Sequence, residues 1–339
     1  MQNNPVIKEG SVRVDLLGGT IDLIPINVIL PHVVTLNLAT SLKAKVILQK
    51  TETDGVEFIS SDYGSRDFFS STSFCENNLR NNHFGKMAFM AQILWRLKVT
   101  KGISIELSSG SPPGAGLGGS SAMGVTFYSA LCEYLQKPLD RHQAIREVNG
   151  IEGLMLDCGP AGYQDYYPAL YGGVLALIAH PGSVEVQQLY SKELKDFLES
   201  HVTLIYSGET RFSGMNNWEV YKGFFDRQGH VREGLERIAK LSYEAYEAIQ
   251  GKKFEDLLSL IGDEGATRKT LFPKIVTDKM SSLCDELRKD IPKLGFKVCG
   301  AGGGGCFLLT HGPKDSQKVK LVATKMGMTP LDFKIEAPL

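Results

Sequence analysis

The chain lacks several features that would place it in a particular class of protein. Its six cysteines form no Cys-x-x-Cys pair, so the sequence supports neither a zinc site nor a disulfide framework. No apolar run approaches the roughly 18 residues that span a bilayer, and no basic segment followed by an apolar stretch near Met1 marks a secretory signal. An excess of charge of one sign is also missing, because the formal net charge is −1. We therefore expect a cytoplasmic protein with reduced thiols, and neither a membrane nor a nucleic acid as its partner.

The residues that are present are typical of a globular protein with two cores. Hydrophobic residues make up 42% of the 339 positions, and this length is comfortable for two cores. Apolar residues that alternate with polar ones predict strands, and apolar residues at helical spacing predict helices, so the expected fold class is α+β. The predicted strands are 12–17, 33–38, 43–49, 103–107, 173–178, 202–206 and 306–310. The predicted helices are 84–97, 120–135, 231–249, 278–289 and 315–326.

Turn-forming residues divide the chain near its middle. The tripeptide His-Pro-Gly at 180–182 follows a predicted strand, and we place a domain boundary shortly after it. Residues 1–190 are expected to form an N-terminal domain and residues 191–339 a C-terminal domain. Within the first of these, the charged and serine-rich residues 60–82 predict a long, partly ordered insertion.

A glycine-rich segment, Pro112–Ala122, lies between a predicted strand and a predicted helix. Glycines let the backbone approach a ligand closely, and a helix N-terminus offers unpaired N–H groups, an arrangement that suits phosphate. A P-loop would need a lysine after its last glycine, but Gly119 is followed by Ser120. The letters of a dinucleotide-binding loop are present, yet residues 108–113 separate the strand from the first glycine, where a Rossmann turn enters directly. A phosphate loop of another kind is expected, and a glycine-rich connection without a ligand is the alternative.

Two further segments combine glycines with charged residues. Arg13–Leu23 contains Gly-Gly-Thr followed by Asp22, and Lys297–Leu309 contains a run of glycines between two apolar stretches. The second segment also has the letters of a dinucleotide-binding loop, but it enters a predicted strand and not a helix. The dinucleotide interpretation is therefore excluded there as well.

A candidate for acid–base chemistry stands between the glycine-rich loop and the domain boundary. Asp165 ends the sequence Gly-Tyr-Gln-Asp within Ile151–Gly173. An alcohol is a poor nucleophile at neutral pH, and a carboxylate within hydrogen-bond reach can orient it and accept its proton. The alternative is a loop aspartate that stabilises a turn.

These segments, in this order along the chain, resemble the motifs of the GHMP kinases, the family of galactokinase, homoserine kinase, mevalonate kinase and phosphomevalonate kinase. The version Gly-Ala-Gly-Leu-Gly-Gly-Ser-Ser-Ala at 114–122 is similar to the loop of D-glycero-D-manno-heptose 7-phosphate kinases and fucokinases. The first motif departs from that branch, because Ile21 separates Thr20 from Asp22 and one glycine is missing. The resemblance implies an N-terminal domain like ribosomal protein S5 domain 2 and a C-terminal ferredoxin-like domain, with ATP and its acceptor between them.

The resemblance also implies roles for individual residues. Asp165 matches the catalytic aspartate, and Arg13 matches a basic group near the transferring phosphoryl. For Arg13 the alternative is an edge-strand arginine paired to a carboxylate. The residues expected to contact the phosphates of ATP are Pro113, Gly114, Ala115, Gly116, Leu117, Gly118, Gly119, Ser120, Ser121, Gly302 and Gly303.

Magnesium and the acceptor are assigned by the same resemblance. Ser121 and Glu152 are expected to hold Mg²⁺, since that ion prefers carboxylate and hydroxyl oxygens together with phosphates and water. Glu147 is close enough in sequence to compete for this role, and a solvated glutamate on a helix face is the alternative for Glu152. The residues expected to contact the sugar are Thr20, Asp22, Asp165 and Tyr171.

The expected activity is the transfer of the γ-phosphoryl of ATP to a hydroxyl of a sugar or sugar phosphate. The anomeric hydroxyl of a heptose 7-phosphate is the leading acceptor, and Arg211 or Asn216 could contact its phosphate. The alternatives are a fucose- or galactose-type hexose 1-kinase, a mevalonate-type alcohol kinase, and a non-catalytic sensor of ATP or sugar. We expect a monomer or a homodimer.

Overall fold

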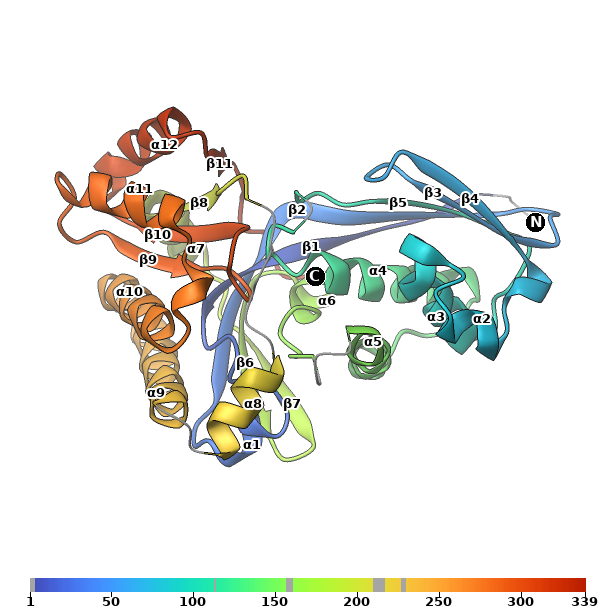
Figure 1. Cartoon of the computed structure of the whole chain (residues 1–339), viewed down its shortest axis with the longest axis horizontal. Coiled ribbons are helices and arrows are strands. Elements are labelled where there is room, and N and C mark those ends of the chain that lie inside the picture. The colour runs from blue at the N-terminus through green and yellow to red at the C-terminus, as the bar shows by residue number, and fades with distance from the viewer. Residues whose placement is uncertain (1–3, 113, 157–160, 210–216, 227–229) are drawn as a thin grey trace.

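The computed structural model describes residues 4–112, 114–156, 161–209, 217–226 and 230–339 (Figure 1). Within these residues the chain forms two mixed lobes, which confirms the α+β class. The N-terminal lobe lies on the right of Figure 1, and the C-terminal lobe lies on the left.

The elements follow one another without a repeat. The strands are β1 (Val6–Leu17), β2 (Val34–Lys50), β3 (Gly55–Ser60), β4 (Ser65–Ser70), β5 (Ile103–Ser108), β6 (Val174–His180), β7 (Ser183–Gln188), β8 (Val202–Tyr206), β9 (Gly295–Val298), β10 (Cys306–Thr310) and β11 (Thr329–Leu331). The α-helices are α1 (Ile26–Ile29), α2 (Glu76–Arg80), α3 (Ala88–Leu97), α4 (Gly119–Tyr134), α5 (Arg141–Leu156), α6 (Tyr167–Tyr171), α7 (Lys192–His201), α8 (Asn217–Phe225), α9 (Val231–Gln250), α10 (Phe254–Leu271), α11 (Asp278–Arg288) and α12 (Ser316–Lys325). Short 3₁₀ helices occur at Ser71–Ser73 (η1), Gly85–Met87 (η2), Pro273–Ile275 (η3) and Pro313–Asp315 (η4).

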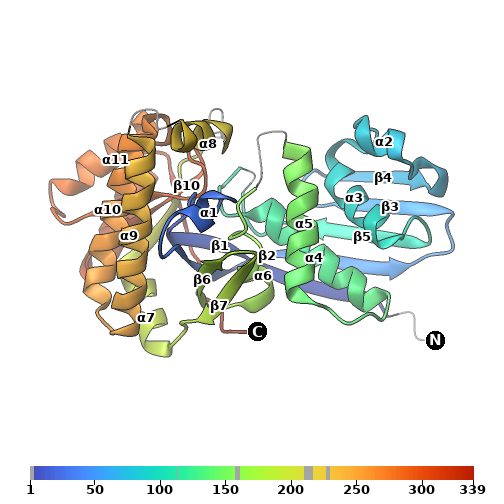
Figure 2. The same cartoon turned by 90° about the horizontal axis from the view of Figure 1, so that it is seen from below.

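The N-terminal sheet has the strand order β4-β3-β5-β2-β6-β7, and β1 pairs with β2 outside this path. Helices α3 to α6 lie against one face of this sheet (Figures 1 and 2). From Gly10 onward β1 is buried at every position, which differs from the alternation of a strand with one solvated face. The reason is that α4 and α6 cover one side of it, while α9 of the C-terminal lobe contacts it as well.

The C-terminal sheet is antiparallel, with the order β11-β8-β10-β9. Strands β8 and β10 are buried on both faces. Ile205 packs with residues of α11 and α12, whereas Leu204 belongs to the core shared with the N-terminal lobe. The hydrophobic core of the N-terminal lobe therefore continues into the C-terminal lobe.

The expected domain boundary falls between β7 and β8, the last strand of the first sheet and the first of the second. After β11 the chain returns to the N-terminal sheet, where Ile335 forms a bridge with Thr40 and Pro338 one with Gly172. A split of the chain at residue 190 stays a proposal, since residues 334–339 join the lobe on the other side of it.

The prediction of a partly ordered insertion at residues 60–82 is wrong. This stretch contains β4, which pairs with β3, and α2. The stretch also contributes to a small aromatic cluster, in which the ring centroids of Phe69 and Phe74 lie 4.8 and 4.9 Å from that of Phe84. Burial of these rings orders the segment in spite of its polar composition.

Two other differences concern a pair of predicted strands and a helix that was not predicted. The strands predicted at 33–38 and 43–49 are one strand, β2, because its ladder with β1 continues through a bulge near Ser11. Helix α10 was not predicted, because its inner face carries Glu264 and Arg268 where apolar residues would mark a helix.

No helix in the described part of the chain is both long and apolar enough to cross a bilayer. The five cysteines within the described residues are free thiols: Cys75, Cys132, Cys284, Cys299 and Cys306.

Candidate functional site

The glycine-rich loop leads directly into α4, as its sequence predicted. Helix α4 begins at Gly119, and no side chain of the described residues caps its N-terminus. Its first N–H groups are therefore available to an anion, and the dipole of the helix favours one. Gly118 has φ +68°, and a Cβ at this position would lie 3.0 Å from the Cβ of Asp165. Only glycine fits there, and it brings the loop against the candidate catalytic carboxylate.

The third glycine-rich segment supports this loop from behind. The Cys306 N–H donates to the Ala115 carbonyl at 2.7 Å, and a Cβ on Gly116 would lie 2.7 Å from the carbonyl oxygen of Cys299. The two loops thus pack backbone to backbone. Gly303 donates its N–H to the Ile275 carbonyl at 2.8 Å, so this amide is used within the C-terminal lobe.

Arg13 and Asp165, 152 positions apart in the chain, form an ion pair beside the loop. Nε and Nη2 of Arg13 each lie 2.8 Å from Oδ1 of Asp165, and Nη1 donates to the Gly116 carbonyl at 2.5 Å. The arginine side chain is 3% exposed and the aspartate 27%. Burial alone would lower the pKa of Arg13, but the charges of Asp165 and Asp15 raise it, so the guanidinium is charged. Arg13 is thus paired to a carboxylate, and that carboxylate is the candidate catalytic one. The role near the transferring phosphoryl stays a prediction.

Ser121 and Glu152 also meet. The Ser121 hydroxyl donates to Oε2 of Glu152 at 2.7 Å, and the Tyr166 hydroxyl donates to the same oxygen at 2.6 Å. Burial raises the pKa of Glu152, and the two hydrogen bonds oppose this effect. Glu147 lies elsewhere on α5 and contacts Arg96, so the geometry favours Glu152.

The donor set fits magnesium. The described residues contain no group of three or more His, Cys, Asp or Glu side chains that could hold a metal ion. A hydroxyl and one carboxylate are typical of a Mg²⁺ site that takes its other ligands from phosphates and water. Ser121 and Glu152 would hold the ion in such a site.

Asp22 lies in a buried polar group next to the catalytic loop. Its Oδ2 accepts a hydrogen bond from the Gln164 N–H at 3.0 Å, and burial raises its pKa to about 7. Several buried oxygens have no hydrogen-bond partner among the described residues: Asn27 Oδ1, Asn37 Oδ1, Tyr163 Oη and Gln164 Oε1. Unpaired buried polar atoms are costly, and hydroxyl groups of a bound ligand or water would satisfy them.

Of the two remaining residues expected to contact the sugar, Thr20 lies near Asp22 and Tyr171 does not. The Thr20 hydroxyl accepts a hydrogen bond from Arg268 and lies in the same turn that leads to Asp22. Tyr171 does not join the group, because its ring contacts His142 and Arg141 at the start of α5. That position is about 15 Å along the helix from Glu152, at 1.5 Å per residue. Pro113, Arg211 and Asn216 lie outside the described residues.

The sequence analysis missed a buried set of charges behind the site. Lys297 Nζ lies 2.8 Å from Oδ2 of Asp15, and Glu264 and Arg268 of α10 lie beside this pair. The signals were weak: Asp15 is a charge inside a predicted strand, and Glu264 and Arg268 have the i,i+4 spacing of an ordinary surface pair. No spacing connects α10 to Asp15.

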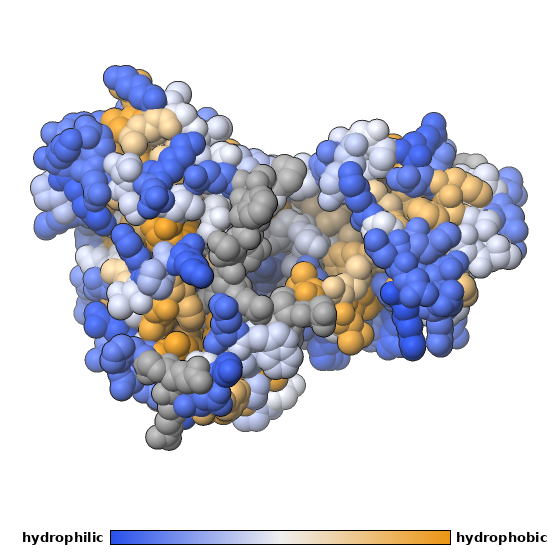
Figure 3. Space-filling view, viewed as in Figure 1, coloured by the Kyte–Doolittle hydropathy of each residue, from blue (hydrophilic) through white to orange (hydrophobic). Residues whose placement is uncertain are grey.

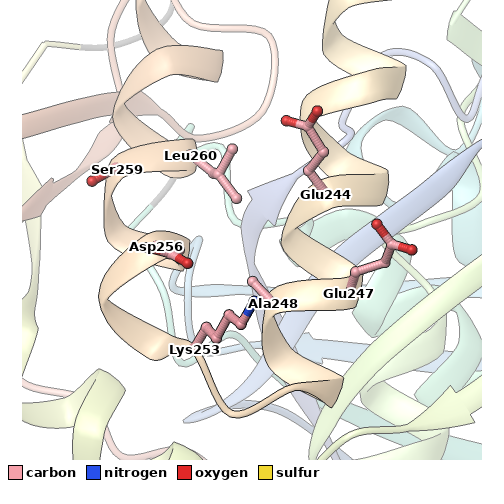
Figure 4. Close-up of a pocket in the computed structure, with 7 residues that line it drawn as sticks. All are labelled: Glu244, Glu247, Ala248, Lys253, Asp256, Ser259 and Leu260. Atoms are coloured by element: carbon pink, nitrogen blue, oxygen red, sulfur yellow. The ribbon is translucent and has the colours of Figure 1, made fainter.

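Two cavities lie away from this group. One of about 440 Å³ lies between α9 and α10, where four of the labelled side chains are charged (Figure 4): Glu244, Glu247, Lys253 and Asp256. The other, of about 1360 Å³, is lined by α10, α11 and the loop at 310–315. Arg13, Ser121 and Asp165 line neither of them. The surface is also indented between the two lobes (Figure 3).

Residues 82–173 match the family model described as the GHMP kinases N terminal domain. The matched stretch contains the phosphate loop, Ser121, Glu152 and Asp165. Over these residues the chain matches the N-terminal domain of the GHMP kinases. This confirms the resemblance on which the motif assignments rest.

Known GHMP kinases resemble the chain at low identity. A D-glycero-alpha-D-manno-heptose 7-phosphate kinase of Campylobacter jejuni is 26% identical over 300 residues, which cover 86% of this chain and 86% of that protein. A bifunctional fucokinase/GDP-fucose pyrophosphorylase of Arabidopsis thaliana is 25% identical over 223 residues. That match covers 65% of this chain but 21% of the larger protein, so the chain corresponds to about a fifth of its length.

The fold is shared with solved structures. The crystal structure of a D-glycero-D-manno-heptose 1-phosphate kinase from Bacteroides thetaiotaomicron has a TM-score of 0.75 at 19% identity, covering 97% of this chain and 99% of that one. At this identity the likeness shows the fold alone, and it confirms the two-domain α+β architecture of the GHMP kinases.

Proposed function

We propose that the chain is an ATP-dependent kinase that transfers the γ-phosphoryl of Mg·ATP to a hydroxyl of a sugar or sugar phosphate. The observation that carries the proposal is the Arg13–Asp165 pair at the edge of the phosphate loop. A carboxylate and a buried cation next to a vacant helix N-terminus are the parts that phosphoryl transfer to an alcohol requires.

The roles follow from the contacts. The N–H groups at the start of α4 would bind the phosphates, and Asp165 would orient the acceptor hydroxyl and accept its proton. Arg13 is fixed by Gly116 and Asp165, so its charge would stabilise the oxygens of the transferring phosphoryl without rearrangement. When bound at Ser121 and Glu152, Mg²⁺ would neutralise phosphate charge.

Asp22 and the buried oxygens around it support a polyhydroxylated acceptor. Carboxylate, amide and phenol oxygens suit neighbouring hydroxyl groups, because each can accept hydrogen bonds that would otherwise be missing. The anomeric hydroxyl of a heptose 7-phosphate is our leading acceptor, since a relative with that printed name matches most of the chain. Fucose is the second candidate, because the larger Arabidopsis relative carries fucokinase in its name.

A non-catalytic sensor has less support. A sensor needs no proton acceptor, yet Asp165 is present and paired with Arg13 beside the loop. We further propose a domain boundary near residue 190, a cytoplasmic location, and a monomer or homodimer.

The test is ADP release from Mg·ATP with a panel of acceptors: heptose 7-phosphate, fucose, galactose, mannose, N-acetylhexosamines and mevalonate. Turnover with one sugar or sugar phosphate would support the proposal and identify the acceptor. If no acceptor in the panel leads to ADP release although ATP binds, the result would favour the non-catalytic sensor.

A further inference from the structure

Four charged side chains are enclosed where the two lobes meet. Asp15 comes from β1, Lys297 from β9, and Glu264 and Arg268 from α10, and each is at most 2% exposed. Two are acidic and two are basic, and burial raises the pKa of Glu264 although Lys297 and Arg268 oppose this effect. Burial alone would raise the pKa of Asp15, yet the charges of Lys297 and Arg268 bring it below its ordinary value.

The backbone around the group is shaped for close approach of α10 to β9 (Figure 1). A Cβ at Gly265 would lie 1.9 Å from the carbonyl oxygen of Phe296, and the Cβ position of Gly262 is 3.3 Å from the Cα of Gly295. Larger residues at either glycine would push the helix away from the strand. The close approach places Glu264 3.6 Å from Lys297 and carries Arg268 past the strand into the N-terminal lobe.

Arg268 contacts both sides of the proposed active site. Its Nη2 donates to the Thr20 hydroxyl in the turn before Asp22, and its Nη1 donates to the Gly300 carbonyl at 3.3 Å. Gly300 in turn packs on Gly116 of the phosphate loop, where its Cβ position is 2.8 Å from the Gly116 carbonyl oxygen. The Arg268 side chain therefore connects the turn at Thr20–Asp22, called the acceptor turn below, to the glycine-rich segment that packs on the phosphate loop.

The turn at Thr20 needs such a contact. Thr20 has φ +77°, a left-handed conformation that is unfavourable for a β-branched residue. The hydrogen bond from Arg268 holds its hydroxyl, and Asp22 follows two residues later. A loss of this contact would let the acceptor turn relax while leaving the two sheets intact.

We propose that Arg268 is a positioning residue that sets the acceptor turn at Thr20–Asp22 relative to the phosphate loop. Asp15 and Glu264, which also pair with Lys297, hold its guanidinium in place. The inference rests on the proposed kinase function for its kinetic consequences only. In phosphoryl transfer, small displacements of acceptor relative to donor reduce the rate even when both are bound. Arg268 thus acts on turnover without touching either substrate.

Two variants separate positioning from stability. Arg268→Met leaves the two buried carboxyl groups of Asp15 and Glu264 with Lys297 as their one remaining partner in the group, so we expect a lower Tm as well as lower turnover. Arg268→Met/Glu264→Met removes one charge of each sign and leaves the Asp15–Lys297 pair, so we expect its Tm to return toward the wild-type value. The contacts to Thr20 and Gly300 remain absent in this double variant. The partly exposed pair Arg232 and Glu236 on α9 gives a matched control, Arg232→Met/Glu236→Met.

The measurements are kcat at saturating substrates, the ATP-induced rise in Tm, and hydrogen exchange of residues 18–22. For the double variant we expect kcat to fall by about tenfold or more with ATP binding retained, and exchange in the turn to increase by about tenfold. Recovery of kcat together with Tm would show a purely structural role and overturn the inference. If the wild type turns over no acceptor, the kinase proposal fails by itself, and hydrogen exchange alone decides: unchanged exchange at 18–22 overturns the positioning role.

Discussion

The Asp165 side chain is partly exposed although its partner Arg13 is buried. One carboxylate oxygen takes both bonds from the guanidinium, and Oδ2 lies 3.2 Å from the position that a Cβ on Gly118 would occupy. The carboxylate is thus oriented by the arginine and remains near the phosphate loop. Such an arrangement suits a group that accepts a proton from a bound alcohol.

Asp165→Asn should lower kcat by about 10² to 10⁴, the usual contribution of a general base. The amide oxygen can still accept from Arg13, so nucleotide binding should persist. ADP release and the ATP-induced rise in Tm measure the two effects. The surface variant Asp54→Asn serves as the control, and undiminished turnover of Asp165→Asn would refute the catalytic assignment.

Asp22 should make stability and acceptor binding depend on pH. Burial raises its pKa from 3.8 to about 7 in the folded protein, whereas the unfolded chain ionises near pH 4. The folded protein therefore binds more protons than the unfolded chain in this window, and stability is lost as pH rises from about 4 to about 7.

Asp22→Asn removes this loss. Above about pH 7 the variant should gain up to about 4 kcal/mol of unfolding free energy relative to wild type, at about 1.4 kcal/mol per pKa unit. Below pH 4 the carboxyl group of Asp22 is protonated in both the folded and the unfolded protein, so the stability difference between variant and wild type should no longer change with pH. Urea unfolding at several pH values measures it, and a difference independent of pH would contradict the assigned protonation. Wild-type KM for the acceptor should fall as pH rises through 7, since the carboxylate accepts hydroxyl hydrogen bonds best when ionised.

At the scale of elements, α4 and α5 are joined through the Ser121–Glu152 hydrogen bond. The same contact places a hydroxyl and a carboxylate at the end of the phosphate loop. Glu147, one turn and a half earlier on α5, is occupied by Arg96, Tyr128 and Gln143.

Glu152→Gln should raise the Mg²⁺ concentration for half-maximal turnover by about tenfold or more, because a neutral amide is a poorer ligand than a carboxylate. Glu147→Gln is the matched control on the same helix and should leave the Mg²⁺ requirement unchanged. A titration of turnover with Mg²⁺ compares them, and the opposite ranking would move the metal role to Glu147.

The glycine-rich loops differ from ordinary turns in what surrounds them. Gly302 and Gly182 both have left-handed φ angles, +70° and +80°. A Cβ at Gly302 would lie 2.5 Å from the Cβ of Ile275, while Gly182 has open space.

Gly182→Ala should therefore cost only the conformational penalty, about 1 kcal/mol. Gly302→Ala should cost about 3 kcal/mol, since overpacking is added to that penalty. Chemical denaturation of both variants provides the comparison. Equal costs would show that the loop adjusts freely around η3.

At the scale of the whole molecule, the two lobes share one apolar core and several chain crossings. The core that contains β1 and β2 also includes Leu204, Leu257 and Leu308 of the C-terminal lobe. Ile335, after the last strand, is 1% exposed and pairs with Thr40 in the N-terminal sheet. These connections favour cooperative unfolding of the two lobes.

The two tryptophans report on opposite lobes, with Trp95 on α3 and Trp218 on α8. The single-tryptophan variants Trp95→Phe and Trp218→Phe should show the same denaturant midpoint, within about 10–15%. Fluorescence and circular dichroism measured on each variant should also coincide. Distinct midpoints for the two probes would show that the lobes unfold separately.

The sequence by itself determined the parts of the protein that depend on local pattern. Alternation and helical spacing predict most strands and five helices, and three ordered motifs carry the resemblance to the GHMP kinases. Arg13, Ser121, Glu152 and Asp165 could be proposed as site residues because each stands in or beside a motif. The prediction for the serine-rich stretch 60–82 was wrong, because its composition is polar although its aromatic rings are buried.

Only the tertiary structure decided which distant residues meet. The contacts between Arg13 and Asp165, and between Arg268 and Thr20, span 152 and 248 positions. The charges buried between the lobes were not predicted, because Asp15 of β1 is compensated by Lys297 of β9 and Arg268 of α10, which lie more than 250 positions away in the chain. Burial also set the pKa of Asp22, which depends on the groups packed around it and on the exclusion of water.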